Sequence, residues 1–276
     1  MTGATGFIGT ALCKRLLEEG LSVHGTVRFL DPSILPRGVA PVQLESIEKK
    51  GEWETILNDT DTVVHLAARV HAKKDSASNP FAEYRKVNVM GSERLALTAA
   101  EFGVKRFIFM SSAKVNGERT EGKSRGQRSE VRGQGSVSKQ FFSEEDVPEP
   151  QDPYAVSKWE AEQVLHKNSD ETGMELVVLR PPLVYGPGVK ANFLKLMKIV
   201  DKGTPLPLAK IDNRRSFIYI ENLVDAVLTC IKHSGSAGQT YFVSDNEDVS
   251  TPELIRKIAS ALKKPARLFP LSLIHI

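Results

Sequence analysis

The sequence has few cysteines, no long apolar run and little net charge. Cys13 and Cys230 are its only cysteines, too few for a disulfide-rich secreted domain. We interpret them as buried free thiols in a reducing compartment, with a disulfide between them as the alternative. No run approaches the ~20 apolar residues of a membrane-spanning helix and no signal peptide is visible, so we predict a cytoplasmic protein. The net charge of +3 is too small to indicate nucleic-acid binding. No metal site is predicted.

The composition is that of a chain with a substantial core. Hydrophobic residues make up 41% of the 276 positions and charged residues 26%, which suits one large domain or two closely joined ones. Predicted strands and helices alternate, so we expect an α/β fold with a doubly wound, right-handed parallel sheet. Strands are predicted at 22–27, 61–68, 105–110, 175–180, 216–220 and 239–244. Further helices are predicted at 52–57, 81–102, 154–167, 192–202, 221–232 and 254–262.

A glycine-rich turn opens the chain. Gly3, Gly6 and Gly9 recur at every third position and begin an amphipathic helix that ends at Gly20. Glycines at such a turn let the backbone approach a pyrophosphate, which lies at the positive N-terminus of the helix. Because the strand 22–27 follows, we predict half of a βαβ dinucleotide-binding unit.

Both ends of the sequence are unusual for this arrangement. Met1 and Thr2 run directly into the glycine turn, where a strand is expected. We therefore expect that the first strand is truncated. Residues 271–276 have no helix or strand context, and we expect them to be a tail that is not native.

Arg28 closes the first predicted strand, nineteen positions after Gly9. Proteins that bind NAD usually place an acidic residue near this position for the ribose hydroxyls, whereas a basic residue suits the 2′-phosphate of NADP. Arg28 therefore slightly favours NADP. The alternative is a solvated arginine at a strand end.

Tyr154 and Lys158 are four positions apart on a helix that begins at Pro153, so they share one helical face. A free phenol, with a pKa near ~10, is a poor acid or base at neutral pH. An ammonium on the same face would lower that pKa. We predict that the pair moves a proton to or from a sugar or alcohol hydroxyl. A chance spacing on a surface helix is the alternative.

Small and hydroxylic residues end two of the predicted strands. Ala67 and Ala68 leave room for a cofactor at the carboxyl end of one strand, and Ser111 and Ser112 end the next. We predict that Ser112 hydrogen-bonds the substrate oxygen that Tyr154 protonates. A serine that merely caps the strand end is the alternative.

Two polar residues are predicted inside the fold. His65, in a buried strand, is interpreted as packed rather than catalytic. Asn88 lies with Gly91 in a long predicted helix, where both residue types cost stability. Their presence indicates that another group approaches the helix closely at this point.

Two basic segments remain. Residues 122–139 contain little apolar surface, so we expect a mobile loop that gates the substrate or has no role. Nucleic-acid binding is the alternative, but no aromatic residue interleaves the basic ones. Arg214 and Arg215 precede a strand and suit a diphosphate, with a solvated basic pair as the alternative.

Taken in order, these motifs resemble the extended branch of the short-chain dehydrogenase/reductase superfamily, in particular the NAD-dependent epimerase/dehydratase family of nucleotide-sugar enzymes. The resemblance runs from Thr2 to about Pro270. The residues that carry it are Thr2–Gly9, His65–Ala68, Asn88, Ser111–Ser112, Tyr154 with Lys158, Arg180–Pro181, Tyr185–Gly188 and Arg215–Phe217.

The resemblance implies roles for individual residues. The implied catalytic group is Ser112, Tyr154 and Lys158. The residues implied to bind NAD(P) are Gly3, Gly6, Phe7, Ile8, Gly9, Arg28, Ala67, Ala68, Asn88, Lys158 and Pro181. Those implied to bind the substrate, a nucleotide-diphosphate sugar, are Ser111, Ala113, Asn192 and Arg215.

The sequence departs from the family pattern at three places, one of which is the loop 122–139, which is longer than usual. An acidic residue usually follows the third strand and contacts adenine, and here Ser46 stands there with Glu45 beside it. The 4,6-dehydratases of the family carry an Asp-Glu pair directly after the catalytic Ser or Thr. Ala113 and Lys114 occupy these positions, which disfavours dehydration.

The implied function is an NAD(P)-dependent nucleotide-sugar 4-epimerase. An NADPH-dependent 4-keto-sugar reductase and a non-catalytic dinucleotide-binding protein are the alternatives. We predict a homodimer that forms through helices 81–102 and 154–166. We assign residues 1–180 and 216–236 to a dinucleotide-binding domain, and 181–215 and 237–276 to a C-terminally truncated substrate-binding part.

Overall fold

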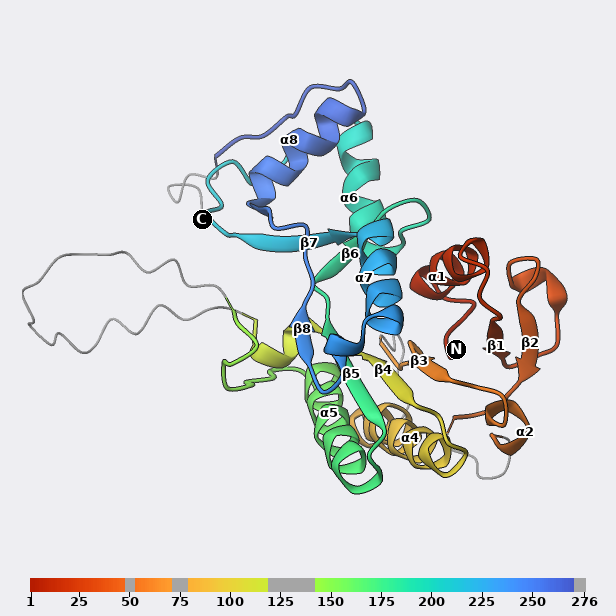
Figure 1. The fold of residues 1–276 in the computed structure, drawn as a ribbon. Coiled ribbons are helices and arrows are strands. Elements are labelled where there is room, and N and C mark those ends of the chain that lie inside the picture. Colours follow the sequence, from red (N-terminus) through yellow and green to blue (C-terminus); the bar gives the residue numbers. More distant parts are fainter. Residues whose placement is uncertain (48–52, 71–78, 119–141, 271–276) are drawn as a thin grey trace, which may run out of the picture.

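A computed structural model describes residues 1–47, 53–70, 79–118 and 142–270 (Figure 1). The predicted loop 122–139 and tail 271–276 lie outside the described residues. The helices are α1 Phe7–Glu18, α2 Glu54–Leu57, α3 Pro80–Tyr84, a π-helical segment Arg85–Met90, α4 Gly91–Glu101, α5 Pro153–Thr172, α6 Ala191–Asp201, α7 Ile220–Lys232 and α8 Thr251–Ala261. The strands are β1 His24–Val27, β2 Ala40–Gln43, β3 Thr62–His65, β4 Arg106–Met110, β5 Glu175–Arg180, β6 Leu183–Tyr185, β7 Arg215–Tyr219, β8 Thr240–Phe242 and β9 Asp248–Val249.

The main sheet has the order β3-β4-β5-β8, and every neighbouring pair is parallel. This confirms the predicted α/β class. Strands β3, β4 and β5 are almost wholly buried, as expected of parallel strands covered by helices on both faces. Their carboxyl ends share one edge of the sheet, so Ser111 and Ser112 after β4 lie beside the exit from β5.

Met1 and Thr2 occupy the place between β1 and β3. The Thr2 amide donates to the Val64 carbonyl at 3.0 Å, and the Thr26 amide donates to the Met1 carbonyl at 2.9 Å. Thr2 also forms an isolated parallel bridge with His65. These bonds join the parallel pair β1-β2 to the main sheet and hold the glycine turn at its carboxyl edge.

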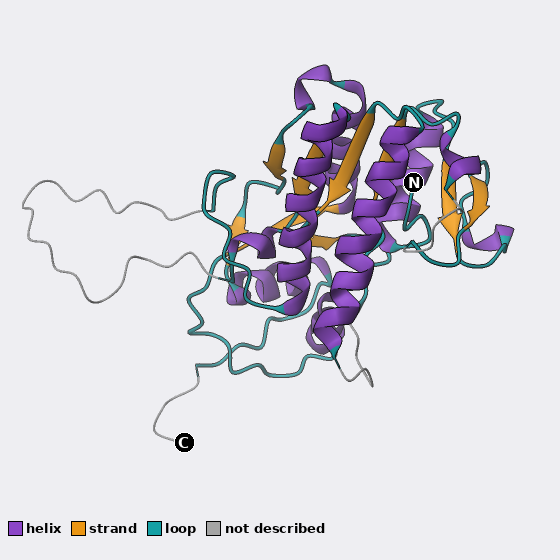
Figure 2. Cartoon of the chain, turned by 90° about the horizontal axis from the view of Figure 1, so that it is seen from below, coloured by secondary structure: helices purple, strands orange, loops and turns teal. Residues whose placement is uncertain are grey.

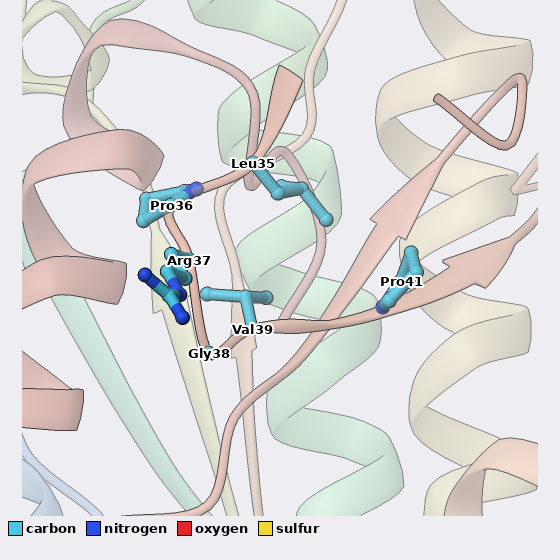
Figure 3. A pocket seen from close by; sticks show the side chains of 6 residues that line it. All are labelled: Leu35, Pro36, Arg37, Gly38, Val39 and Pro41. Carbon is cyan, nitrogen blue, oxygen red and sulfur yellow. The ribbon is translucent and has the colours of Figure 1, made fainter. Parts of the chain in front are cut away.

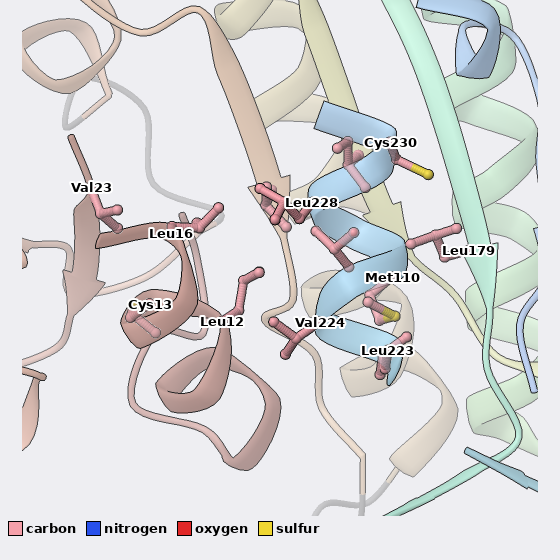
Figure 4. Close-up of a cluster of buried hydrophobic side chains, with 14 of the residues drawn as sticks. Leu12, Cys13, Leu16, Val23, Met110, Leu179, Leu223, Val224, Leu228 and Cys230 are labelled. Carbon is pink, nitrogen blue, oxygen red and sulfur yellow. The ribbon is translucent and has the colours of Figure 1, made fainter. Parts of the chain in front are cut away.

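Two layers of helices cover the sheet. Helices α1 and α7 pack on one face, with Leu12, Leu223 and Val227 fully buried between them and the strands (Figure 4). Helices α4 and α5 cover the other face, which is turned toward the viewer in Figure 2. Cys13 and Cys230 are free and buried, as predicted. Across the described ranges, no helix combines the length and apolar character needed to cross a bilayer.

A smaller part lies beyond the carboxyl edge of the sheet (Figure 1). Strands β6, β7 and β9 form its sheet, in which β9 is antiparallel to β7. Helices α6 and α8 enclose a separate apolar cluster that includes Val200 and Ile255. The strand pairing differs from the predicted division of the chain: β7 belongs to this smaller sheet, whereas β8 pairs with β5 in the main one.

Some local structure differs from the sequence predictions. Strands β2, β6 and β9 were not predicted; β2 has no buried side chain and so lacks the alternation that identifies a strand. The helix predicted at 81–102 is interrupted by the π-helical segment, which contains Asn88. Pi-helical turns are frequent at functional sites. The predicted helix at 154–167 extends to Thr172, where Gly173 ends it in a left-handed conformation.

Candidate active site

The glycine turn is packed too tightly for side chains. Gly3 has a positive φ of 68°, and a Cβ there would lie 2.9 Å from the Ala67 nitrogen. A Cβ on Gly9 would lie only 2.1 Å from the Gly3 carbonyl oxygen. Both positions therefore require glycine, and the turn presents backbone rather than side chains at the start of α1.

The N-terminus of α1 suits an anion. Gly6 is the N-cap residue and supplies no side-chain hydrogen bond, and the first turn has no acidic residue. The first bond within the helix runs from the Thr10 amide to the Gly6 carbonyl, at 2.9 Å. The amides of Phe7, Ile8 and Gly9 precede that bond and have no acceptor within the helix. This arrangement fits the pyrophosphate of a dinucleotide.

His65 connects this turn to the helices beneath it. Ser92 donates its hydroxyl hydrogen to the Asn88 carbonyl at 2.6 Å, so His65 Nε2 must be the donor in its 2.9 Å bond to Ser92. Thr2 then donates to Nδ1 at 2.6 Å and accepts from the Ala67 amide at 3.1 Å. Burial lowers the pKa of His65 to about 3. His65 is thus a neutral, packed residue, as predicted.

Asn88 holds the chain that leaves β3 against α5. Its side-chain oxygen accepts from the Arg69 amide at 2.8 Å, and its amide donates to the Arg69 carbonyl at 3.1 Å and to the Ser157 hydroxyl at 2.9 Å. Asn88 is 1% exposed. The close approach predicted for Asn88 is therefore made to protein groups beside the predicted cofactor position.

The two serines after β4 have different environments. Ser111 is buried and donates its hydroxyl hydrogen to Glu162, on α5. Ser112 caps the short 3-10 helix Ala113–Asn116, because its hydroxyl oxygen accepts from the Lys114 amide at 3.3 Å. Its hydroxyl hydrogen is left for another acceptor. Ser111, predicted to bind the substrate, is 3% exposed and has its hydroxyl hydrogen engaged by Glu162.

Tyr154 lies one residue after Pro153, in the first turn of α5. Asp152 caps this helix by accepting from the Ala155 amide at 2.8 Å. The Ser112 hydroxyl lies close enough to the Tyr154 phenol to lower its pKa, so the two predicted catalytic hydroxyls are neighbours. Burial, with a smaller effect of Asp152, raises the pKa of Tyr154 to about 12. The sequence predicted a lowered pKa, and this direction is wrong for the chain alone because burial outweighs the opposing effects of Ser112 and Lys114.

Lys158 lies one turn further along α5 and is 2% exposed. Its ammonium donates to the Met110 carbonyl at 2.8 Å and lies 4.4 Å from the centre of the Phe109 ring. Burial lowers the pKa of Lys158 to about 7, although the Glu162 carboxylate opposes this shift. Lys158 is thus poised to exchange a proton near neutral pH.

A buried ion pair that the sequence did not predict lies beside the predicted catalytic side chains. Arg180, at the end of β5, donates to both Glu162 oxygens, and it also donates to the Asn116 side chain at 3.0 Å. The Glu162 and Arg180 side chains are 0% and 5% exposed. The available signal was a carboxylate four residues after Lys158, on the same helical face.

Other residues predicted to bind the cofactor or the substrate are more exposed than Tyr154 and Lys158. Arg28, Asn192 and Arg215 all have exposed side chains, after β1, in the first turn of α6 and at the start of β7. Pro181 is closer to the catalytic group, since its carbonyl accepts from the Ala113 amide at 2.9 Å. Arg214, predicted with Arg215 to bind a diphosphate, instead donates to the Asp248 carbonyl at 3.1 Å.

A cavity elsewhere has no role in this arrangement. Its volume is about 270 Å³, and it is lined by Leu35, Pro36, Arg37, Gly38, Val39 and Pro41 (Figure 3). These residues connect β1 to β2 and include none of the predicted site residues. Arg37 is the only ionisable side chain in the lining.

A parallel Rossmann-type sheet with a glycine turn, a serine, a tyrosine and a lysine at its carboxyl edge defines a dinucleotide-dependent enzyme of the extended short-chain dehydrogenase/reductase class. Comparison with known proteins agrees with this assignment. The model of the NAD dependent epimerase/dehydratase family matches residues 1–244. The chain belongs to this family, and it is an NAD(P)-dependent enzyme.

Individual relatives are similar over nearly the whole chain. UDP-glucose 4-epimerase from Vibrio cholerae is 42% identical over 275 residues, which cover 98% of this chain and 77% of that protein. An N-acetyl-alpha-D-glucosaminyl-diphospho-ditrans,octacis-undecaprenol 4-epimerase from Escherichia coli O157:H7 is 27% identical, over 96% and 72%. The structure of UDP-glucuronic acid 4-epimerase from Bacillus cereus in complex with NAD has a TM-score of 0.79 at 25% identity, over 98% and 85%.

Proposed function

We propose that this chain is a nucleotide-sugar 4-epimerase that inverts the C4 hydroxyl of a UDP-sugar with bound NAD(P). The observation that carries the proposal is that the Ser112 hydroxyl is near enough to act on the Tyr154 phenol, one helical turn before the buried Lys158 and at the sheet edge that also carries the glycine turn. The 42% identity to an epimerase of UDP-glucose supports the sugar class.

The residues would divide the chemistry as follows. The amides of Phe7, Ile8 and Gly9 would hold the pyrophosphate of the dinucleotide. When bound, the nicotinamide supplies a group that accepts and returns a hydride. Tyr154, as a phenolate, would take the proton from the C4 hydroxyl and later return it, while Ser112 donates a hydrogen bond to the same oxygen. Arg215 and Asn192 would hold the diphosphate of the sugar.

The raised pKa of Tyr154 sets a requirement for this mechanism. A phenol with a pKa of about 12 is almost wholly protonated at neutral pH. The positive charge that an oxidised nicotinamide would bring to the site is of the sign that lowers this pKa. We therefore expect Tyr154 to become an effective base only when the cofactor is bound.

The test is incubation of the purified chain with a panel of UDP-sugars, followed by NMR of the configuration at C4. An epimerase converts the sugar without added coenzyme, because its hydride is returned to the same carbon. A 4-keto-sugar reductase instead consumes reduced coenzyme on a keto sugar. Bound dinucleotide with no conversion of either kind would overturn the proposal in favour of a non-catalytic protein.

We also propose that the chain forms a homodimer through the faces of α4 and α5. The observation in support is that Met90 and Leu97, on the π-helical segment and α4, are 56% and 38% exposed. Light scattering on the purified protein measures the mass directly. A monomer at micromolar concentration would contradict the proposal.

A further inference from the structure

Lys114 occupies an unusual position beside the catalytic group. It lies in the 3-10 helix Ala113–Asn116, two residues after Ser112. Its ammonium contacts two carboxylates, Glu118 Oε1 and Asp152 Oδ2, each at 2.7 Å. Both ion pairs are half-exposed, with the Lys114 side chain 46% exposed. Lys114 has no proposed contact with the cofactor or with the substrate.

The pair with Asp152 joins the two segments that carry the catalytic hydroxyls. The Lys114 amide donates to the Ser112 hydroxyl at 3.3 Å. Asp152 uses its other oxygen to accept from the Ala155 amide at 2.8 Å, which fixes the start of α5. Ser112 and Tyr154 therefore lie at the two ends of one continuous set of contacts that passes through Lys114 and Asp152.

Within the part of the chain that the structure describes, three ionisable groups act on the Tyr154 phenol. Lys114 favours its ionised form, whereas Asp152 and Tyr84 disfavour it. Burial opposes the charge on Lys114, but its hydrogen bonds to Asp152 and Glu118 raise its pKa overall. Lys114 thus stays cationic near neutral pH. Lys158, by contrast, is buried and its pKa is lowered to about 7.

We propose that Lys114 is a positioning residue of this active site: its ammonium ties the Ser112 segment to the start of α5 and supplies a fixed positive charge that faces Tyr154. This inference rests on the proposed function of Tyr154 as the acid and base. It gives Lys114 a role distinct from that of a general base, because an ammonium paired with two carboxylates has no lone pair to accept a proton.

The experiment titrates Tyr154 in the full chain loaded with NAD. Tyrosines carry a ¹³C label at Cζ, and the Tyr154 signal is the one that is lost in Tyr154→Phe. Lys114→Met should raise the midpoint by at least about half a pH unit, because it removes a cation near the phenol. Asp152→Asn keeps an oxygen for the cap but removes the opposing charge, so it should lower the midpoint. Lys114→Arg keeps the positive charge, so its Tyr154 midpoint should equal that of the unaltered chain.

The matched control is Lys105→Met. Lys105 also pairs with a carboxylate at 2.7 Å, on Asp61, but it lies just before β4, at the far end of that strand. Its removal should leave the midpoint unchanged. If Lys114→Met and Asp152→Asn moved the midpoint in the same direction, or neither moved it, the proposed role would be wrong.

The titration requires no turnover, so it separates this inference from the proposed function. Failure of the function would appear as a lack of UDP-sugar conversion by the unaltered chain, whatever the Tyr154 midpoint does. If Lys114→Met does not fold, Asp152→Asn and Glu118→Gln still test the inference, because each removes a negative charge that partners Lys114. Unshifted midpoints in both would contradict it.

Discussion

The catalytic side of the site and its substrate-binding side are built differently. Behind the catalytic hydroxyls, Lys158 and Arg180 are 2% and 4% exposed, and protein groups accept their hydrogen bonds. On the opposite side, Asn192 and Arg215 are exposed. The groups proposed for the chemistry are therefore backed by side chains that the protein itself orients, whereas the groups proposed to hold the substrate are left for the ligand to order. Preorganisation is most valuable where charge develops during a reaction.

The largest expected effect tests the catalytic side. Tyr154→Phe removes the proton donor and acceptor but keeps the ring, so kcat should fall by about 10²- to 10⁴-fold with little change in thermal stability. Kinetics of UDP-sugar conversion and a thermal melt measure the two. Tyr241→Phe, in β8, is the control and should retain full activity. A Tyr154→Phe variant with normal kcat would show that the chemistry lies elsewhere.

The next largest effect tests how much the buried ion pair of Arg180 and Glu162 contributes to stability. Arg180→Leu leaves the Glu162 carboxylate buried without its partner, so the free energy of unfolding should fall by about 3–5 kcal/mol. Urea denaturation measures it. The matched control is Arg85→Leu, which breaks a solvent-exposed ion pair with Glu160 and should change the free energy of unfolding far less. If the free energy of unfolding fell equally in the two variants, the buried pair would be no more important to stability than the exposed one.

A third prediction concerns pH. Lys158 has a pKa of about 7 in the folded chain, below its ordinary value of 10.5. As pH rises through this window the folded chain loses the proton first, so the unfolded chain binds more protons and stability increases with pH. The slope should reach up to about 1.4 kcal/mol per pH unit.

The variant Lys158→Met should remove that rise, since the group that titrates is gone. Urea denaturation between about pH 7 and pH 9.5 measures the slope in both proteins, below the range where tyrosines ionise. The difference between the two slopes isolates Lys158, because the N-terminus and the two cysteines, whose pKa values are also shifted, are common to both proteins. Equal slopes would show that Lys158 is not held in an unfavourable charged state.

The smallest effect tests the substrate-binding side. Arg215→Ala should raise KM about tenfold with kcat nearly unchanged, because an exposed arginine that holds a diphosphate contributes to binding more than to chemistry. Initial rates over a range of UDP-sugar concentrations measure both constants. Arg214→Ala is the adjacent control; it interacts with Asp248 and Glu253 and should alter KM less. A larger effect on kcat than on KM would place Arg215 in the chemical step.

Several features could be predicted because they depend on local spacing. The glycine turn, the shared face of Tyr154 and Lys158, and the serines at the end of β4 each follow from the geometry of one turn, one helix or one strand end. The parallel sheet follows from the alternation of such elements. Strand β2 was missed because it buries no side chain and so leaves no periodic pattern.

The sequence by itself determined which residues stand at the edge of the sheet, because the periods of helices and strands are local properties. Only the tertiary structure decided what those residues touch. Glu162 meets Arg180 across 18 positions and Lys114 meets Asp152 across 38, and such partners are chosen by how whole elements pack. The raised pKa of Tyr154 is likewise decided by the tertiary structure. It results from burial, which depends on every segment around the phenol and is specified by no local pattern.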